Sequence, residues 1–260
     1  MVTTLVSQEQ IGFALQLADQ AAEIVRARFR QPFSFEAKSD ASPVTEVDRA
    51  VEAACRASVA AERPQEGVIG EEYGPDRPQA AWQWIIDPID GTRAFMAGRP
   101  TFGTLIALAF EGRPVLGVID QPIVRDRWLG VLGRATLFNG VAAVVRPCAK
   151  LGDAVVGTTN PELFPVDEAR RWRDLQAATG SRIYGGDCTI YGALASGWLD
   201  VVCERGLQLY DFAALVPVIE GAGGSMTDWS GAPLTTTSHG HVLAVGDRSL
   251  LPELLGLLAR

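Results

Sequence analysis

The sequence predicts an α/β protein with α+β character in its first half. Residues 1–150 hold several apolar strand segments, and the two-residue connection Glu111-Gly112 joins two of them as a hairpin, so this half should contain a largely antiparallel sheet. From residue 151 to 260, strand and helix segments alternate, which is typical of an α/β half. No low-complexity tract or long linker separates the halves, so we expect them to pack as one unit.

The first half should begin with two amphipathic helices. Ser7 opens a capping box, and apolar residues then recur at three- and four-residue steps over 7–30. A second helix is expected over 45–60, with Thr45 and Asp48 at its capping positions. The strands of this half are expected at 67–70, 82–87, 104–110, 114–120 and 127–131.

The second half should supply five strands and three helices. The strands are expected at 154–158, 182–184, 199–203, 225–227 and 242–245. The helices are expected at 166–179, 189–197 and 212–220. Pro217 lies inside the last of these helices and should kink it, because proline lacks the N–H that the helix needs.

Composition restricts the partners. The chain has 260 residues, of which 47% are hydrophobic and 21% charged, as in an ordinary globular protein. Its net charge of −8 argues against nucleic acid and anionic membranes as partners. An acidic protein with clustered carboxylates would bind a phosphate only through cations.

The sequence also predicts a cytoplasmic protein. No apolar stretch is long enough to span a membrane, and the N-terminus lacks the order of a signal peptide. Four widely separated cysteines form no metal-type pair, and we expect reduced thiols. His239 and His241 form a His-x-His pair that could bind a metal, but an exposed turn is the preferred interpretation.

The most informative segment is 84–92, Trp-Ile-Ile-Asp-Pro-Ile-Asp-Gly-Thr. An apolar strand ends on Asp87 and Asp90, whose like charges must be neutralised if they are buried together. A divalent cation would do this, and hard oxygen ligands suit Mg²⁺. Gly91 and Thr92 offer backbone N–H groups to an anion.

Three other interpretations of this segment are a turn, an EF-hand loop and a haloacid-dehalogenase phosphatase signature. Asp-Pro and Asp-Gly also form turns, so the segment could be a loop with a capping aspartate. The spacing excludes an EF-hand loop. The haloacid-dehalogenase phosphatase signature is disfavoured because Ile89 adds one residue between the carboxylates, which reverses the face of the second in an extended segment.

Two further acidic residues stand at the ends of predicted elements. Glu71 follows the strand at 67–70, where a solvated glutamate is the simpler interpretation. Asp211 opens an apolar helix, where a helix cap is the simpler interpretation. Three acidic termini in one chain suggest a shared metal site, although sequence does not prove that they converge.

Several motifs together resemble the inositol monophosphatase family of Mg²⁺-dependent, Li⁺-sensitive phosphatases. The motifs are Gly70-Glu71-Glu72, residues 84–92, Tyr210-Asp211 and Glu220-Gly221-Ala222-Gly223-Gly224, with Lys38-Ser39-Asp40, Pro43-Val44-Thr45 and Asp48 near the N-terminus. The resemblance covers nearly the whole chain. It implies a layered α-β-α-β-α sandwich.

Other segments look like the histidinol-phosphate phosphatase branch. They are Arg93-Ala94-Phe95, residues 98–108, Ile119-Asp120-Gln121-Pro122, Arg127-Trp128, Gly185-Gly186-Asp187-Cys188 and Gly206-Leu207-Gln208. Two departures are Arg93-Ala94, where relatives often have Lys-Ser, and Leu209, where a proline is expected. The first keeps the positive charge, and the second could shift the substrate pocket.

The resemblance implies a role for each site residue. Two or three Mg²⁺ ions would be held by Glu71, Asp87, the Ile89 carbonyl, Asp90 and Asp211. Glu71 and Thr92 would position and deprotonate the attacking water, and Asp48 would orient the Thr92 hydroxyl. The Gly91 and Thr92 amides would bind phosphate, and Asp187 and Glu204 would contact the leaving group.

We therefore expect a phosphomonoesterase that hydrolyses L-histidinol phosphate in histidine biosynthesis. The alternative is an inositol-1-phosphatase or a phosphatase of broader sugar and polyol specificity. A catalytically silent regulatory subunit is a further hypothesis, disfavoured because every site residue is present. The expected partner is a small phosphate monoester, and family analogy suggests a homodimer.

Overall fold

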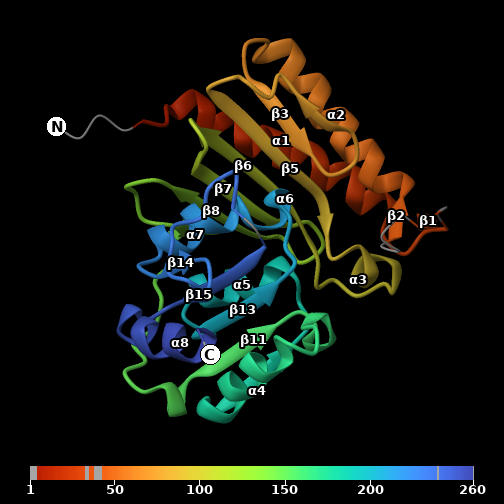
Figure 1. Ribbon diagram of the computed structural model, residues 1–260. Helices are drawn as coiled ribbons and strands as arrows, with labels where there is room; N and C mark the ends of the chain where they lie inside the picture. Colours follow the sequence, from red (N-terminus) through yellow and green to blue (C-terminus); the bar gives the residue numbers. More distant parts are fainter. Residues whose placement is uncertain (1–4, 33–34, 38–42, 239, 260) are drawn as a thin grey trace.

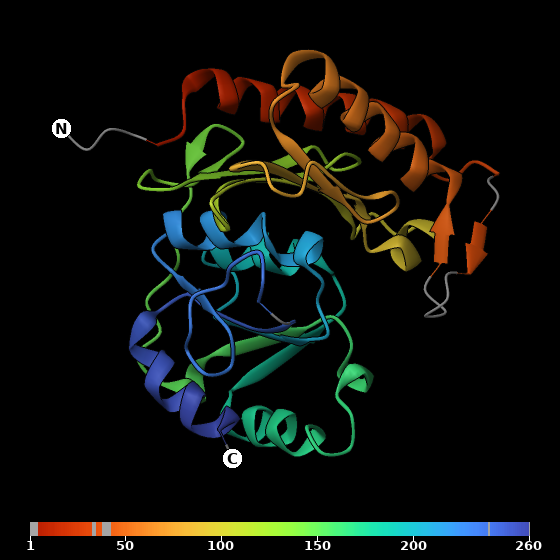
Figure 2. The same cartoon turned by 45° about the horizontal axis from the view of Figure 1, so that its top comes forward.

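The protein folds into five alternating layers of helix and sheet. The computed structural model describes residues 5–32, 35–37, 43–238 and 240–259. Figure 2 shows the layers from the side: α1 (Gln8–Arg28) and α2 (Glu46–Glu62) cover one sheet, a central helical layer separates the two sheets, and α4 (Ala169–Ala178) and α8 (Leu251–Leu258) cover the second sheet. The α-β-α-β-α sandwich is confirmed.

The two long N-terminal helices start where their caps predict. Ser7 and Gln10 form a reciprocal capping box at α1, and Thr45 and Asp48 form another at α2. Both caps satisfy N–H groups that a helix N-terminus otherwise leaves unpaired. The apolar faces of the helices pack in one core with Trp84, Ile86 and other residues of the first sheet.

The first sheet has eight strands in the order β10-β9-β8-β7-β6-β5-β3-β4 (Figure 1). Their bounds are Val141–Ala142, Leu137–Phe138, Asp126–Val131, Arg113–Gln121, Gly103–Phe110, Trp82–Asp90, Gly67–Gly70 and Gly74–Asp76. Only the β3–β5 pair is parallel among these neighbours, so the expectation of a largely antiparallel sheet is correct. The short strands β4, β9 and β10 were not predicted. A separate ribbon pairs β1 (Phe35–Ala37) with β2 (Pro43–Thr45).

The second sheet has five strands in the order β12-β11-β13-β15-β14. Their bounds are Ser181–Tyr184, Val155–Thr158, Val201–Arg205, His241–Val245 and Ser225–Thr227. The strand expected at 199–203 begins two residues later than predicted. Short 3₁₀ turns at Leu151–Asp153, Pro161–Leu163 and Arg248–Leu250 connect elements of this half.

The predicted helix at 212–220 is two helices. The chain forms α6 (Leu209–Phe212), breaks at 213–214, and continues as α7 (Leu215–Gly221). Pro217 therefore lies in the first turn of α7, where its missing N–H is tolerated, and the interruption precedes it. Together with α5 (Cys188–Ala195), these helices form the central layer. The sequence analysis did not predict α8.

Helix α7 lies close to the first sheet because glycines face it. A Cβ atom on Gly117 of β7 would lie 1.9 Å from the Ala214 carbonyl oxygen, and one on Gly130 of β8 would lie 2.3 Å from the Val218 nitrogen. Such distances are far below van der Waals contact, so larger residues would force the helix away. These glycines fix the spacing between the central layer and the first sheet.

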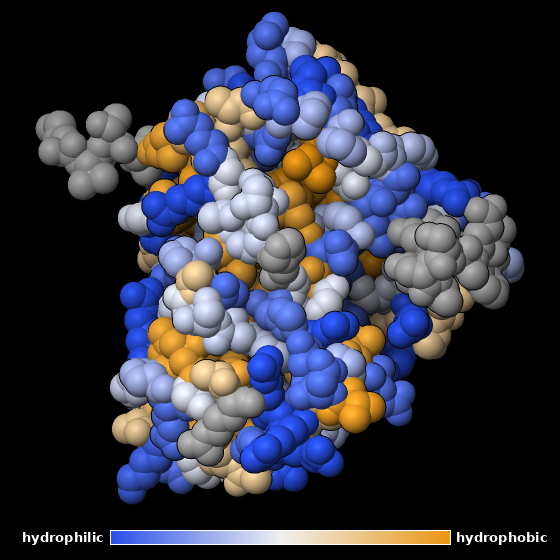
Figure 3. All heavy atoms as spheres, viewed as in Figure 1, coloured by the Kyte–Doolittle hydropathy of each residue, from blue (hydrophilic) through white to orange (hydrophobic). Residues whose placement is uncertain are grey.

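Several surface expectations can now be compared with the fold. His241 begins β15 rather than lying in a turn, and its Nε2 is 2.9 Å from Glu168 Oε1, whereas His239 and Lys38-Ser39-Asp40 lie outside the described residues. All four cysteines are buried free thiols. Among the described residues, no helix combines the length and apolarity that crossing a membrane requires. The face in Figure 3 mixes hydrophilic and hydrophobic residues over both halves.

We predict that Gly117→Ala destabilises the protein by about 1–3 kcal/mol, because the new methyl group overlaps the Ala214 carbonyl and displaces α7. At about 2–4 °C per kcal/mol, thermal unfolding should detect the change. Gly12→Ala in α1 is the matched control, since its Cβ meets nothing within 4 Å. That variant should be neutral or stabilising by up to about 1 kcal/mol. Equal melting temperatures for both variants would contradict the packing argument.

Candidate metal centre

Three carboxylates from two elements converge at the end of β5. Asp87 and Asp90 belong to β5, Asp211 belongs to α6, and one oxygen of each lies within 4.8 Å of the others. Figure 1 shows α6 beside β5. A regular strand would point residues three apart to opposite faces. The pairing of β5 with β6 shifts register between Asp87 and Asp90, and this irregularity lets both side chains reach one site.

Burial makes this cluster electrostatically unfavourable without a cation. Asp87 is 1% exposed, and its Oδ1 has no hydrogen-bond partner in the part of the chain that the structure describes. Burial raises the pKa of Asp87 well above its usual value, and the charges of Glu71, Asp90 and Asp211 raise it further. An unpaired, buried carboxylate oxygen among other carboxylates is a suitable ligand for a hard divalent cation.

Asp90 has a similar environment with one compensating contact. Burial raises the pKa of Asp90 well above normal, and the charges of Asp187 and Asp211 add to this effect. The Cys188 backbone N–H donates a hydrogen bond to Asp90 Oδ2, which partly favours the ionised form. Cys188 is the first residue of α5, so this bond ties the central layer to the end of β5.

Asp211 is not the cap residue that the simpler interpretation suggested. Gln208 occupies the cap of α6, and its backbone N–H donates to Asp211 Oδ2 at 2.6 Å. Asp211 is thus the third residue of α6, in its first turn, and forms part of a capping box. This bond fixes the side chain at the helix start, beside Asp87 and Asp90.

Thr92, Ile89 and Asp48 lie together next to the cluster. The Thr92 hydroxyl is 3.1 Å from the Ile89 carbonyl oxygen and 3.5 Å from Asp48 Oδ1. The predicted contact with Asp48 is therefore the longer of the two. Asp48 Oδ2 accepts a bond from the Thr45 backbone N–H at 2.9 Å, and burial raises the pKa of Asp48. Asp48 therefore both caps α2 and reaches toward Thr92.

A residue that the sequence analysis missed holds the turn carrying Glu71. Glu52 of α2 is fully buried, and its carboxylate accepts backbone N–H bonds from Glu72 at 2.6 Å and Tyr73 at 3.2 Å. Arg56 Nε donates to the same carboxylate at 2.7 Å. A Cβ on Gly70 would lie 2.1 Å from Glu52 Oε1, so only glycine allows this approach. Glu52 therefore fixes the backbone on both sides of Glu71.

Gly91 allows the chain to turn from β5 into α3 (Thr92–Met96). Its φ of 95° is favourable only for glycine, and a Cβ there would lie 2.8 Å from Asp187 Oδ2. Asp187 is the N-cap residue of α5, with φ 45°, and its side chain makes no capping hydrogen bond. Burial raises the pKa of Asp187 to about 6, although Arg99 and Arg93 oppose the shift.

Glu204 is buried at the end of β13 in the second sheet. It is 1% exposed, and its Oε1 accepts the Thr159 backbone N–H at 2.5 Å, while Thr158 Oγ1 lies 3.3 Å from Oε2. Burial raises the pKa of Glu204 to about 7, and the charge of Asp187 adds to the increase. The two residues predicted to contact substrate thus interact electrostatically, with Asp187 next to the carboxylate cluster.

Comparisons with known proteins identify the family and several relatives of this chain. The sequence profile of the inositol monophosphatase family matches residues 7–259. The chain is 46% identical over 217 residues to the bifunctional phosphatase IMPL2, chloroplastic, of Arabidopsis thaliana, a match covering 83% of this chain and 63% of the plant protein. The chain thus spans less than two thirds of the length of that relative.

Two further relatives match over most of their length. Histidinol-phosphatase of Mycobacterium tuberculosis is 34% identical over 237 residues, covering 86% of this chain and 89% of that protein. An inositol monophosphatase from Zymomonas mobilis has a solved structure with a TM-score of 0.90 and 47% identity, covering 97% of this chain and 98% of that chain.

We predict that Asp90→Asn stabilises the metal-free protein relative to wild type, increasingly as the pH rises. Folding raises the pKa of Asp87 and Asp90, so the folded form holds protons that the unfolded form releases. The folding stability that these protons contribute is fully present below the pKa that the two carboxyl groups have in the unfolded chain. It is lost as the pH rises through their higher pKa in the folded protein. Urea unfolding in EDTA from pH 5 to about 8 should give a difference of about 1 kcal/mol or more at the upper end.

The control for this measurement is Asp174→Asn on α4, an aspartate whose side chain is 35% exposed. The difference in unfolding free energy between Asp174→Asn and wild type should stay the same from pH 5 to about 8. Parallel pH curves for wild type and Asp90→Asn would mean that the carboxylates do not repel one another in the folded protein.

Proposed function

The chain belongs to the inositol monophosphatase family, and from this membership we propose that it is a Mg²⁺-dependent phosphomonoesterase of small polyol phosphates, including inositol monophosphate. The observation that carries the proposal is the group of three carboxylates, Asp87, Asp90 and Asp211, within 4.8 Å of one another. The sequence predicted this activity with histidinol phosphate as the preferred substrate, and the substrate class proposed here is the alternative given there. The relatives at 46–47% identity are named a bifunctional phosphatase and an inositol monophosphatase, which favours the broader alternative over histidinol phosphate alone.

The donor set fits Mg²⁺, which prefers carboxylate and carbonyl oxygens. In this proposal Asp87, Asp90 and Asp211 hold the metal, together with Glu71 and the Ile89 carbonyl, in a site for two or three ions. When bound, such ions polarise phosphate oxygens and lower the pKa of a bound water. The raised pKa values of Asp87 and Asp90 mean that binding competes with protons, so the affinity should fall at acidic pH.

The remaining residues then orient and deprotonate the attacking water. Glu71 would accept a proton from this water, and Thr92 would orient it through its hydroxyl. Bonds from Thr92 to Ile89 or Asp48 would leave an oxygen lone pair of the hydroxyl directed at the water. The Gly91 and Thr92 amides, where α3 begins, would donate to phosphate oxygens.

Histidinol phosphate is the second candidate substrate. Asp187 and Glu204 are two carboxyl groups on the substrate side of the cluster, and an ionised carboxylate favours a cationic leaving group. The histidinol-phosphatase named above, at 34% identity, supports the same candidate. Family analogy further suggests a homodimer, which light scattering would test.

Phosphate release should require Mg²⁺ and should stop in EDTA. Asp90→Asn should lower kcat/KM by about a thousandfold or more while the protein stays folded, because a metal ligand is lost. Inositol 1-phosphate should be hydrolysed with a kcat/KM at least equal to that for histidinol phosphate. Activity that survives EDTA would overturn the metal mechanism, and a tenfold or greater preference for histidinol phosphate would overturn only the substrate assignment.

Glu52→Gln should raise the Mg²⁺ concentration needed for half-maximal activity by about 10–100-fold, because groups that orient metal ligands have effects of this size. Gln keeps the size of the side chain but weakens its bonds to the Glu72 and Tyr73 amides. Excess Mg²⁺ should restore much of the turnover, whereas a general folding defect would not respond to metal. Glu62→Gln, at the exposed end of the same helix, should leave the requirement unchanged.

A further inference from the structure

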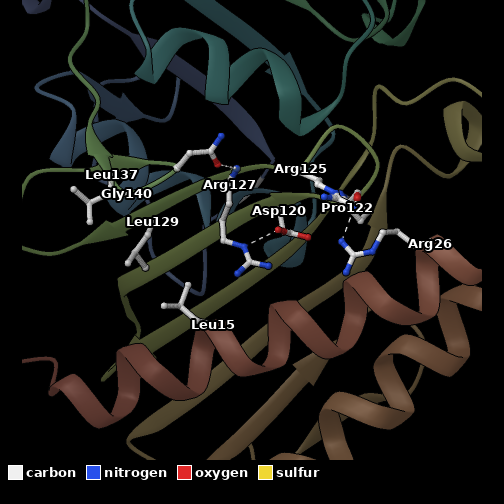
Figure 4. A pocket seen from close by; sticks show the side chains of 10 residues that line it. Leu15, Arg26, Asp120, Pro122, Arg125, Arg127, Leu129, Leu137 and Gly140 are labelled. Atoms are coloured by element: carbon white, nitrogen blue, oxygen red, sulfur yellow. Dashed lines mark hydrogen bonds and ion pairs between the residues drawn. The ribbon is translucent and has the colours of Figure 1, made fainter.

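A cavity lies between α1 and the strands β7, β8 and β9, away from the candidate metal centre. Figure 4 shows it from close by, and its volume is about 440 Å³, within the range of small-molecule sites. Its lining residues are Leu15, Arg26, Asp120, Pro122, Arg125, Arg127, Leu129, Leu137, Asn139 and Gly140. None of these residues belongs to the candidate metal centre.

This cavity and the metal centre lie on opposite faces of the first sheet. In β5, Ile86 packs in the core beneath α1 and α2, whereas Ile85 packs in the core of the central layer. Asp87 follows Ile85 by two residues and shares its face. In β7, Ile119 packs in the core of the central layer. Its neighbour Asp120 therefore points to the opposite face of the sheet, where it lines the cavity against α1. The cavity is therefore a separate site.

One end of the cavity contains a buried carboxylate with an unused oxygen. The Asp120 side chain is 5% exposed, and its Oδ1 accepts a bond from Arg127 Nε at 2.6 Å. Its Oδ2 is buried and has no partner among the described residues. Arg127 also pairs with Asp19 at 2.8 Å, so its charge is shared between two carboxylates. Asp120 can thus accept a further hydrogen bond, best from a cationic donor.

Two other arginines stand at the same end of the cavity. Arg26 of α1 donates to the Pro122 carbonyl at 3.3 Å and interacts favourably with the charge of Asp120. Arg125 lies in the turn between β7 and β8, with φ 64°. Arg26 and Arg125 are both exposed, so their guanidinium groups remain accessible to a ligand. In a protein with net charge −8, these two guanidinium groups form a local positive site that suits a carboxylate.

The other end of the cavity is apolar. Leu15 from α1, Leu129 from β8 and Leu137 from β9 line it, and Figure 4 shows them on the far side of Arg127 from Arg26. Each of these side chains is only partly buried. Covering them with an apolar ligand group would be favourable by about 25 cal/mol for each Å² removed from water.

We propose that this cavity binds a free α-amino acid with an apolar side chain. The ammonium group would donate to Asp120 Oδ2, the carboxylate would accept from Arg26 and Arg125, and the side chain would pack on the three leucines. The arrangement of charges selects a zwitterion. A simple amine would be repelled by the two arginines, and a phosphate or simple acid would leave Asp120 Oδ2 without a donor and place a second negative charge beside it.

Calorimetric titration of the full-length protein with L-leucine tests the proposal. Two matched probes share the side chain: 4-methylpentanoate lacks the ammonium group, and 3-methylbutan-1-amine lacks the carboxylate. L-Leucine should bind with a Kd of about 1 mM or tighter, and each probe should bind at least about tenfold more weakly. If neither L-leucine nor the other apolar amino acids bind at millimolar concentrations, the proposal is wrong.

Two variants locate the site. Arg26→Gln with Arg125→Gln should weaken L-leucine binding by about tenfold or more, while Asp120→Asn should remove the preference for L-leucine over 4-methylpentanoate. Arg28→Gln is the control, because Arg28 lies on the same helix but pairs with Glu46 outside the cavity. Unchanged binding in the Arg26 and Arg125 double variant would place the ligand elsewhere, and equal binding of 4-methylpentanoate to wild type would contradict selection for a zwitterion.

Discussion

Repulsion among the carboxylates at the end of β5 is the constraint on which the rest of the structure depends. Asp87, Asp90 and Asp211 are held within 4.8 Å of one another, although burial and the neighbouring charges disfavour the ionised forms of Asp87 and Asp90. The fold opposes this repulsion with fixed N–H donors. The Cys188 backbone N–H donates a hydrogen bond to Asp90, and the Gln208 backbone N–H donates one to Asp211. The fold itself therefore orients both side chains. The fold thus holds these carboxylates together against their mutual repulsion, as a site for a hard cation requires.

The central helical layer connects this constraint to the rest of the fold. Asp90 is bonded by the first residue of α5, and Asp211 lies on α6, which leads directly into α7. The position of α7 depends on Gly117 and Gly130, because a methyl group at either position would overlap its backbone. Two glycines without polar side chains therefore help to set the position of Asp211, which lies on α6 just before α7. The separation between helix layer and sheet is as much a part of the site as the ligands are.

Local sequence signals predicted much of the fold but little of the support around the site. Capping boxes at α1 and α2 and the strands β3 and β14 follow from short motifs and alternation. The two-residue strands β9 and β10 carry too few residues for a periodic signal. Asp87 and Asp90 stood out because two acidic residues at the end of an apolar strand are chemically unusual, whereas the roles of the other site residues were inferred from the family resemblance. Glu52 was not identified, since it sits in the middle of a helix, and its contacts with the Glu72 and Tyr73 amides exist only in the folded chain.

The charges around Asp187 and Glu204, which we propose contact the leaving group, bear on the choice of substrate. Asp187 and Glu204 by themselves suggest a preference for a cationic leaving group. Arg93 and Arg99 act on Asp187 with the opposite sign, and burial raises the pKa of Glu204 to about 7, so only part of its population is ionised near neutral pH. The positive charges of Arg93 and Arg99 therefore offset part of the negative charge of these two carboxylates, which reduces the preference for an amine over a neutral polyol. Partly offset charges of this kind support the proposed phosphatase of several small phosphate esters over one restricted to a cationic substrate.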